Sequence, residues 1–250
     1  MRLGALLGPI SKSDGPSFLA DQARMFEAEG YSSLWSAHTI GRSGMLTDPL
    51  IALAVAAVAT SSVDVGTAVL QAPLFTPLDI AHRVISLHQI CGDRLNLGIG
   101  AGSTKDDFEA MGKDYGARFK TLNTMADMFR DLYKREGLAG QLKPWKNINT
   151  PPKLLLGSWG AGVENAARNY DGWIASAHYR SMEELENAAA RYAQAGGTKS
   201  VVSTIVLDGD TDLGELKERL ERYKAAGFGE AVIMLFPGAP SAKDVRKLIA

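Results

Sequence analysis

The residues that could do chemistry gather in two glycine-rich segments and at two histidines. The first segment is Arg94-Leu95-Asn96-Leu97-Gly98-Ile99-Gly100-Ala101-Gly102, in which apolar residues alternate with small or polar ones. This alternation predicts a buried strand, and the glycines leave its backbone open to close approach. An acidic run follows and predicts the start of a helix. A strand that ends in open backbone before a helix is suited to a flat or phosphorylated ligand.

The second glycine-rich segment, Gly157–Gly162, follows the apolar run Leu154–Leu156. Ser158 can donate a hydroxyl hydrogen bond, and Gly160 and Gly162 leave backbone N–H groups unobstructed at the start of a short predicted helix. We therefore expect a phosphate here. The segment contains no lysine or arginine, so backbone amides would do most of the binding. A plain glycine turn is the alternative interpretation.

His38 and His178 each stand just past the end of a predicted strand. Because imidazole titrates near neutral pH, either could transfer a proton or hydrogen-bond a ring. We take both as candidate catalytic residues, and a structural hydrogen bond is the alternative for each. Tyr115 and Arg118 lie where a loop enters a predicted helix, and they could close over a ligand.

Short apolar runs, each followed by an amphipathic helix, must position these residues. We predict eight such strands: Arg2–Leu7, Tyr31–Ala37, Val63–Leu70, Leu95–Ile99, Leu154–Leu156, Gly172–Ala177, Val201–Leu207 and Ala231–Phe236. Strands that alternate with helices predict a parallel sheet, and eight units in 250 residues suit a closed (β/α)8 TIM barrel. No linker or shift of composition divides the chain, so residues 1–250 are expected to form a single compact barrel domain.

The structural alternative is an open, doubly wound sheet that binds a dinucleotide. It would carry G-x-G-x-x-G after the first strand, where this chain has Gly8-Pro9-Ile10.

In a closed barrel, the active site lies at the carboxyl ends of the strands. That rule brings together five groups of residues: Ser36 with His38, Thr67–Gln71, Gly100–Ser103, Ser158–Gly162, and His178 with Tyr179.

Composition and charge exclude several classes of function. The formal net charge is −1, so we expect no nucleic-acid partner. The single cysteine, Cys91, cannot form a disulfide within the chain, and the longest apolar run, Leu50–Ala59, is too short to cross a bilayer. The N-terminus starts a strand rather than a signal peptide, so we expect a cytoplasmic protein with no membrane contact.

We also expect no metal site. Asp208, Asp210 and Asp212 resemble the start of a calcium loop, but Leu213 and Arg219 stand where that loop needs glycine and glutamate, so we interpret a turn and a helix cap. His82 and His88 are six residues apart on one predicted helix, too far apart for a metal pair.

Five segments along nearly the whole chain keep an order and spacing that resemble one family. They are Gly30–Trp35 leading to His38, Val65–Leu70 leading to Pro77, Asp93–Gly102, Phe108–Gly112, and Leu156–Gly160 continuing to Asp171–Trp173. Together they resemble the bacterial luciferase-like flavin monooxygenases and their deazaflavin-dependent relatives. Many members carry a long insertion, whereas here Gly137–Pro152 is short.

The resemblance implies a barrel that holds a flavin or deazaflavin at the carboxyl ends of its strands. The family's phosphate-binding segment is matched by Ser158, Trp159, Gly160, Ala161 and Gly162. A bulge behind the isoalloxazine ring, where the family tends to carry a non-proline cis peptide, is matched by Thr67, Ala68 and Val69. Ala101 and Gly102 would flank the ring, and His38 matches a position near its reactive face. Barrels of this family tend to form homodimers.

We therefore predict a flavin-dependent oxidoreductase of the luciferase-like monooxygenase type, acting on a small-molecule substrate. FMN is favoured over an F420-type deazaflavin, whose acidic tail would favour a basic rim such as Lys143 and Lys146. With FMN, the reduced flavin reacts with oxygen, and with the deazaflavin, hydride passes to the substrate.

A non-catalytic flavin-binding barrel is one alternative to this prediction. A sugar-phosphate isomerase or aldolase is another, but no predicted strand ends in the lysine or carboxylate that it needs.

Overall fold

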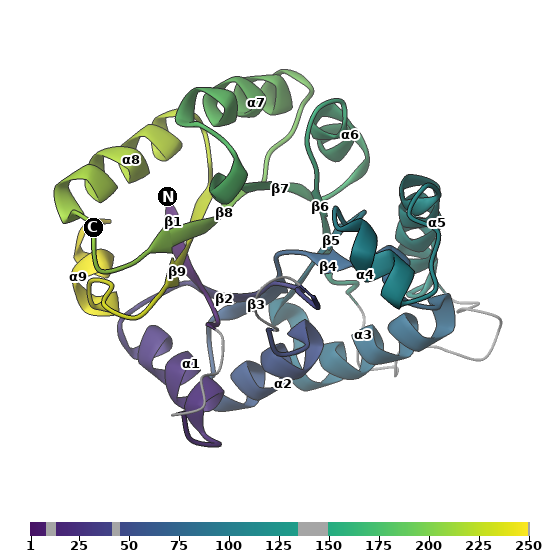
Figure 1. Ribbon diagram of the computed structural model, residues 1–250, viewed down its shortest axis with the longest axis horizontal. Helices are drawn as coiled ribbons and strands as arrows, with labels where there is room; N and C mark the ends of the chain where they lie inside the picture. The colour runs from purple at the N-terminus through teal and green to yellow at the C-terminus, as the bar shows by residue number, and fades with distance from the viewer. Residues whose placement is uncertain (9–13, 42–45, 135–149, 250) are drawn as a thin grey trace.

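A computed structural model describes residues 1–8, 14–41, 46–134 and 150–249 as a closed barrel of parallel strands surrounded by helices (Figure 1). The hydrogen-bonded strand order is β3-β2-β1-β9-β8-β7-β6-β5-β4, and β3 also pairs with β5, which closes the barrel. The predicted (β/α)8 barrel is therefore confirmed.

The bounds of the elements follow the predicted units closely. The strands are β1 (Arg2–Leu6), β2 (Ser33–Ser36), β3 (Asp64–Thr67), β4 (Leu70–Gln71), β5 (Leu95–Gly100), β6 (Lys153–Gly157), β7 (Gly172–Ser176), β8 (Ser200–Leu207) and β9 (Glu230–Leu235). The α-helices are α1 (Phe18–Ala28), α2 (Pro49–Ala59), α3 (Pro77–Cys91), α4 (Lys105–Ala110), α5 (Arg118–Asp131), α6 (Gly162–Asn169), α7 (Met182–Gln194), α8 (Leu213–Ala225) and α9 (Ala242–Lys247). Short 3-10 helices are η1 (Ala72–Leu74), η2 (Gly92–Arg94) and η3 (Ala177–Tyr179).

The third predicted strand is divided into β3 and β4 by a bulge. Gly66 pairs with Asn96 and Leu70 pairs with Ile99, so four steps along this strand match three steps along β5. One extra residue is therefore accommodated between the two parts. We treat β3 and β4 as one barrel strand, which gives eight.

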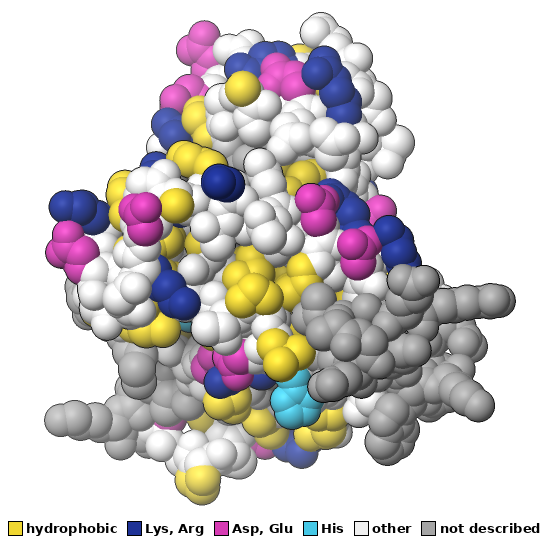
Figure 2. Space-filling view, turned by 90° about the vertical axis from the view of Figure 1, so that its right-hand side faces the viewer, with side chains coloured by type: hydrophobic (Ala, Val, Ile, Leu, Met, Phe, Trp, Pro, Cys, Tyr) yellow, Lys and Arg dark blue, Asp and Glu magenta, His cyan; other side chains and the backbone are white. Residues whose placement is uncertain are grey.

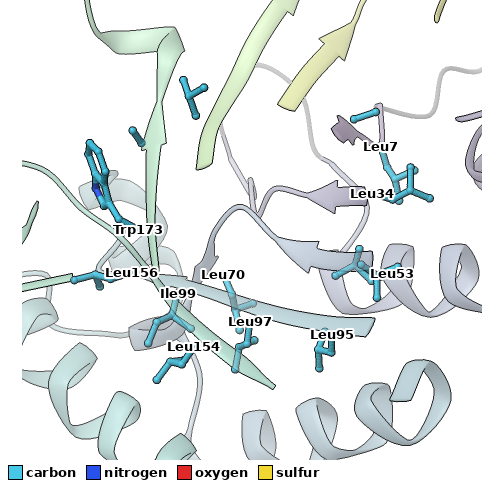
Figure 3. Close-up of a cluster of buried hydrophobic side chains, with 14 of the residues drawn as sticks. Leu7, Leu34, Leu53, Leu70, Leu95, Leu97, Ile99, Leu154, Leu156 and Trp173 are labelled. Atoms are coloured by element: carbon cyan, nitrogen blue, oxygen red, sulfur yellow. The ribbon is translucent and has the colours of Figure 1, made fainter. Parts of the chain in front are cut away.

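Apolar side chains fill two separate cores. The larger core lies between the strands and the surrounding helices, and it includes the leucines, Ile99 and Trp173 labelled in Figure 3. The smaller core lies inside the barrel and consists of Leu6, Trp35, Ala68, Leu155, Ile174, Val201, Val232 and Met234. These side chains fill the interior of the barrel below its carboxyl end.

Polar residues close the amino end of the barrel, and we call this group the barrel floor. Arg2 forms an ion pair with Asp64 (2.6 Å), and Lys199 donates a hydrogen bond to Asn96 (2.5 Å). Buried Glu230 accepts hydrogen bonds from Ser33 and from the indole N–H of Trp35 (2.8 Å for the latter). Burial lowers the pKa of Lys199. Polar closure at this end is consistent with a site at the opposite, carboxyl end.

The surface on the side of α5 and α6 carries basic and acidic side chains that are interspersed (Figure 2). Within the described ranges, no helix is long and apolar enough to span a membrane. Lys143 and Lys146, which were considered as a basic rim for a deazaflavin, lie outside the described residues, as does most of the segment Gly137–Pro152.

Arg94 ties the strand β5 to the end of helix α2. Its guanidinium donates to the carbonyls of Ala57 (2.7 Å) and Val63 (3.3 Å) and to the Thr60 hydroxyl (3.1 Å). The last carbonyls of a helix have no partner within the helix, so a cation there satisfies them and also favours the helix dipole.

We expect Arg94→Met to lower the free energy of unfolding by about 2 kcal/mol, because several half-buried acceptors would lose their donor. Urea denaturation followed by circular dichroism would measure the change. Arg83→Met is the matched control, since Arg83 forms an exposed pair with Asp79 (3.0 Å) on α3, and such pairs contribute about 0.5 kcal/mol or less. Equal effects of the two changes would contradict this role of Arg94.

Candidate active site

A cavity of about 410 Å³ opens at the carboxyl end of the barrel. Of the twelve residues expected at the site, eight line it: His38, Ala68, Val69, Ala101, Gly102, Ser158, Trp159 and His178. They come from the ends of five different barrel strands or the loops after them. The fold therefore brings together residues that are far apart in the sequence. Thr67, Gly160, Ala161 and Gly162 do not line the cavity.

The bulge between β3 and β4 forms one wall of the cavity. The Ala68–Val69 peptide bond is cis, which confirms the expectation for this segment. Thr67 is fully buried behind the wall, where its hydroxyl donates to the carbonyl of Gly98 (2.6 Å). Thr67 thus supports the bulge, and Ala68 and Val69 are the residues that face the cavity.

The glycines at the ends of β5 and β6 make room for this bulge. A Cβ atom on Gly98 would lie 2.1 Å from the Thr67 carbonyl oxygen. A Cβ on Gly100 or Gly157 would lie 2.7 or 2.6 Å from a methyl carbon of Val69. The bulge therefore occupies the space beside these glycines, which is a reason for glycine that the sequence pattern did not indicate. Gly100 also lines the cavity.

His38 is held by Gln71, the last residue of β4. The backbone N–H of Gln71 donates to Nδ1 of His38 (3.3 Å), and the Gln71 carboxamide N–H donates to the His38 carbonyl (3.0 Å). The ring of His38 also stacks on Phe75, with 5.4 Å between ring centroids. A neutral imidazole that accepts at Nδ1 carries its proton on Nε2. His38 can therefore offer an Nε2–H donor to a ligand.

The electrostatic environment keeps His38 uncharged. Burial lowers the pKa of its imidazole below the ordinary value, while the negative charges of Asp48 and Asp107 act in the opposite direction. Burial is the larger effect, because a charged ring loses its hydration when it is enclosed. A neutral histidine at this position can donate or accept a proton as a ligand requires.

Gln71 leaves one polar atom without a partner. Its side-chain oxygen Oε1 is buried and accepts no hydrogen bond, although the residue lines the cavity and is only 6% exposed. Gly102, with a φ of +80°, passes so close that a Cβ there would lie 2.7 Å from Oε1. Buried acceptors are rarely left unsatisfied, so this oxygen is a candidate acceptor for a hydrogen bond from a ligand.

His178 lies in η3 at the rim of the same cavity and is exposed to solvent. Its ring packs edge-on against Tyr179, with 4.5 Å between ring centroids. The two candidate histidines thus line one cavity, but in different surroundings. His38 is fixed by hydrogen bonds and half-buried, whereas His178 is exposed.

In the loop after β6, two of the groups that were expected to bind an anion already form hydrogen bonds within the loop. The Ser158 hydroxyl donates to the carbonyl of Gly162 (2.8 Å), and the Gly162 amide donates to the carbonyl of Trp159 (3.1 Å). Both donors are therefore used to close the turn before α6. The amides of Gly160 and Ala161 have no partner among the described residues. These two amides are the donors that the loop can offer to an anion.

Sequence reasoning missed Arg180, which lines the cavity just beyond His178 and Tyr179. Its guanidinium carbon lies 4.4 Å from the centroid of the Trp159 ring. The signal in the sequence is a cation shortly after the end of the predicted strand Gly172–Ala177, whereas the cations proposed for the rim were Lys143 and Lys146.

Two hydroxyl residues of β8 also line the cavity without having been predicted. Ser203 donates to the carbonyl of Ala175 (3.1 Å), and Thr204 has a φ of +60°, a backbone conformation that β-branched residues rarely adopt. The pairing of β8 with β9 is irregular between Val202 and Ile205. No pattern in the sequence marks this bulge, because threonine is an ordinary strand residue.

The pair Tyr115 and Arg118 does not line the cavity, although the neighbouring Phe119 does. Arg118 lies between two rings, with its guanidinium carbon 3.8 Å from the centroid of Tyr115 and 4.3 Å from that of Phe119. The Tyr115 hydroxyl donates to the Ser103 carbonyl (3.2 Å). These contacts support Phe119 at the rim.

The carboxylates of the rejected calcium-like run have structural roles. Asp208 accepts a hydrogen bond from the backbone N–H of Asp210 (3.1 Å), and Asp212 caps α8 through the N–H of Glu215 (2.9 Å). This confirms the interpretation as a turn and a helix cap. Within the described part of the chain, no cluster of three or more histidine, cysteine, aspartate or glutamate residues could hold a metal ion.

Comparison with known proteins matches the chain to a family of monooxygenases. A family model described as luciferase-like monooxygenase matches residues 3–230. The 4-hydroxyprotoasukamycin monooxygenase of Streptomyces nodosus subsp. asukaensis is 32% identical over 111 residues, which cover 43% of this chain and 30% of that protein. The matched part thus spans less than a third of that relative's length.

Two solved structures with different cofactors share the fold. An F420-dependent secondary alcohol dehydrogenase in complex with an F420–acetone adduct has a TM-score of 0.82 and 14% identity, covering 99% of this chain and 98% of that chain. The FMN complex of the oxygenating constituent of 3,6-diketocamphane monooxygenase from Pseudomonas putida has a TM-score of 0.65 and 18% identity, covering 87% and 70%. At these identities the likeness shows the architecture alone.

We expect His38 to be neutral at pH 7, with its proton on Nε2, and to titrate below the ordinary value of 6.5. Nitrogen-15 NMR of the imidazoles would measure both properties, with His38→Gln identifying the resonance. Because the folded-state pKa is lowered, the unfolded chain binds this proton more tightly, so stability is lost as the pH falls below 6.5 through the folded pKa. A proton on Nδ1, or a midpoint above 6.5, would contradict the described geometry.

Proposed function

The chain belongs to the luciferase-like monooxygenase family, and on that basis we propose that it is a flavin-dependent oxidoreductase with its cofactor in the cavity at the carboxyl end of the barrel. The observation that carries this proposal is the unpartnered Oε1 of Gln71 in a cavity walled by Ala68 and Val69. A flavin ring system carries both a flat face and N–H donors. A volume of about 410 Å³ also suits a cofactor site.

Specific residues of this chain would hold the ring. Ala68 and Val69 would support one face, Ala101 and Gly102 would flank it, and Gln71 would accept a hydrogen bond from a ring N–H. The loop amides of Gly160 and Ala161 would bind the phosphate, with Ser158, Trp159 and Gly162 shaping the turn. The bound flavin would supply the redox chemistry, which no protein side chain provides.

Within that arrangement, His38 is the candidate for moving a proton. Its fixed Nε2–H can donate to a developing negative charge, and its lowered pKa keeps the ring neutral before it acts. His178 is a second candidate, at the exposed rim. The partly apolar walls would limit the access of water to the reacting groups.

FMN is the cofactor that we favour, with an F420-type deazaflavin as the alternative. Among the described residues that line the cavity, Arg180 is the one lysine or arginine. The acidic tail of a deazaflavin would need more positive charge than this.

The family resemblance also supports a homodimer, which we keep as a proposal. Ile51 (58% exposed) and Val58 (75% exposed) give α2 an apolar outer face that a partner could cover.

An absorbance titration of the purified protein with FMN and with F420 tests the proposal. We expect FMN to bind at micromolar concentration or tighter. Oxygen uptake by the protein loaded with reduced FMN would then be compared in the wild type and in His38→Ala. A lower rate with unchanged FMN affinity would support a catalytic His38, whereas an unchanged rate would rule out this role for His38. Binding of neither cofactor would contradict the proposed function.

A charge placed in the loop after β6 tests the phosphate assignment. We expect Gly160→Asp to weaken FMN binding by roughly 10-fold or more, because the carboxylate would repel a phosphate. Gly160→Asn is the matched control, since asparagine has the same size and tolerates the φ of +61° at this position equally well. Equal FMN affinities of the two variants, measured by the same titration, would remove the phosphate from this loop.

A further inference from the structure

We propose that Arg180 is the anion-binding residue of the cavity and that it takes the phosphate of the bound cofactor. This inference rests on the proposed function. It assigns to one side chain the positive charge that the glycine loop after β6 lacks. It is supported by the charge of the cavity wall, by the contacts that place Arg180, and by the unpartnered acceptor of Gln71.

The charges around the cavity are unbalanced. Among the described residues that line it there is no aspartate, glutamate or lysine, and Arg180 alone carries a permanent charge. An arginine in a partly enclosed site is stabilised by an anion, and its planar guanidinium fits a phosphate in two-point geometry. The wall therefore favours a ligand with one localised negative group.

Contacts on both sides direct Arg180 toward the glycine loop. Its guanidinium lies over the indole of Trp159, and Trp159 immediately precedes the free amides of Gly160 and Ala161. On the other side, Nη1 of Arg180 lies 3.4 Å from a carboxylate oxygen of Glu184. The stacked arginine and the two free amides thus belong to one region of the rim.

The Glu184 contact positions Arg180 without using up its donors. Glu184 is fixed by the capping box of α7, in which it accepts from the Ser181 amide (2.8 Å) and the Ser181 hydroxyl accepts from the Glu184 amide (3.2 Å). The arginine side chain is 35% exposed, and a partly exposed pair at this distance is weak. A guanidinium has five N–H donors, so most remain for a ligand.

An independent observation in the same cavity is the unpartnered side-chain oxygen of Gln71. Gln71 is only 6% exposed, and its side-chain oxygen Oε1 has no hydrogen-bond partner. That oxygen requires a donor, whereas Arg180 requires an acceptor. One molecule with ring N–H donors and an anionic end satisfies both groups, and a ring system with a phosphorylated side chain has this chemistry.

The same phosphate chemistry could come from the cofactor or from a phosphorylated substrate. We commit to the cofactor, because Arg180 stacks on the loop whose amides match the cofactor phosphate segment. The experiment must therefore separate a phosphate that is covalently attached to the flavin from one that arrives independently. FMN and riboflavin differ only in this group, so they form a matched pair of ligands.

The test is to measure dissociation constants of FMN and riboflavin for four proteins by fluorescence quenching. They are the wild type, Arg180→Met, Arg180→Lys and the control Arg222→Met. Arg222 pairs with Glu186 (2.9 Å) and does not line the cavity. We expect Arg180→Met to weaken FMN about 10- to 100-fold and riboflavin less than 2-fold, since only FMN loses a charge-assisted contact. Arg180→Lys should recover part of the loss, and Arg222→Met should change neither ligand.

Each other outcome has a definite meaning. If Arg180→Met weakens both ligands equally, Arg180 supports the fold of the rim and the inference is wrong. If neither ligand changes, the FMN-loaded wild type and Arg180→Met are titrated with inorganic phosphate. A spectral response that is lost in the variant would assign Arg180 to a phosphorylated substrate, and no response would overturn an anion role. If the wild type binds neither flavin, the proposed function fails, whatever the variants do.

Discussion

Steric fit between one bulge and three glycines determines the shape of this site. Thr67 and Val69 occupy space that a Cβ on Gly98, Gly100 or Gly157 would fill. The missing side chains let the strand formed by β3 and β4 carry an extra residue while both parts remain paired with β5. The bulge turns Ala68 and Val69 toward the cavity and places Gln71 beside His38. Without these glycines the wall could not approach β5 and β6, and the histidine would lose its partner.

A second bulge lies on the opposite side of the barrel. In the strand order, β8 is four barrel strands away from the β3–β4 strand in either direction. There the irregular pairing with β9 and the positive φ of Thr204 bring Ser203 and Thr204 into the cavity wall. Bulges at the rim of a barrel redirect side chains that a regular strand would send elsewhere. Two opposed bulges thus give the cavity one wall of backbone and small apolar groups and another of hydroxyls.

Electrostatics divides the barrel into a floor and a mouth with different properties. At the floor, Arg2, Asp64, Glu230 and Lys199 are close to partners of opposite charge or to polar groups, so their charges are compensated within the protein. At the mouth, the neutral His38 and the unpartnered Gln71 oxygen leave hydrogen-bonding capacity unused, and Arg180 has only a weak, partly exposed pair with Glu184. Compensated groups stabilise a fold, whereas uncompensated ones are available to a ligand. This contrast agrees with the rule that barrel sites lie at the carboxyl ends of the strands.

The sequence by itself determined the architecture and most of the site's location. Alternating apolar residues and helix signals predicted the eight barrel strands, and the strand-end rule predicted that His38, His178, the bulge and parts of both glycine segments meet at one cavity. Local periodicity reports such features because it depends only on which face of an element is buried. The tertiary structure alone decided what each group does there. It showed that Gly98 and Gly100 accommodate the bulge, that the Ser158 hydroxyl closes its own turn, and that Arg180 stacks on Trp159. These facts depend on contacts between residues distant in the chain, and a local pattern of residue types carries no information about which distant atom fills a given space.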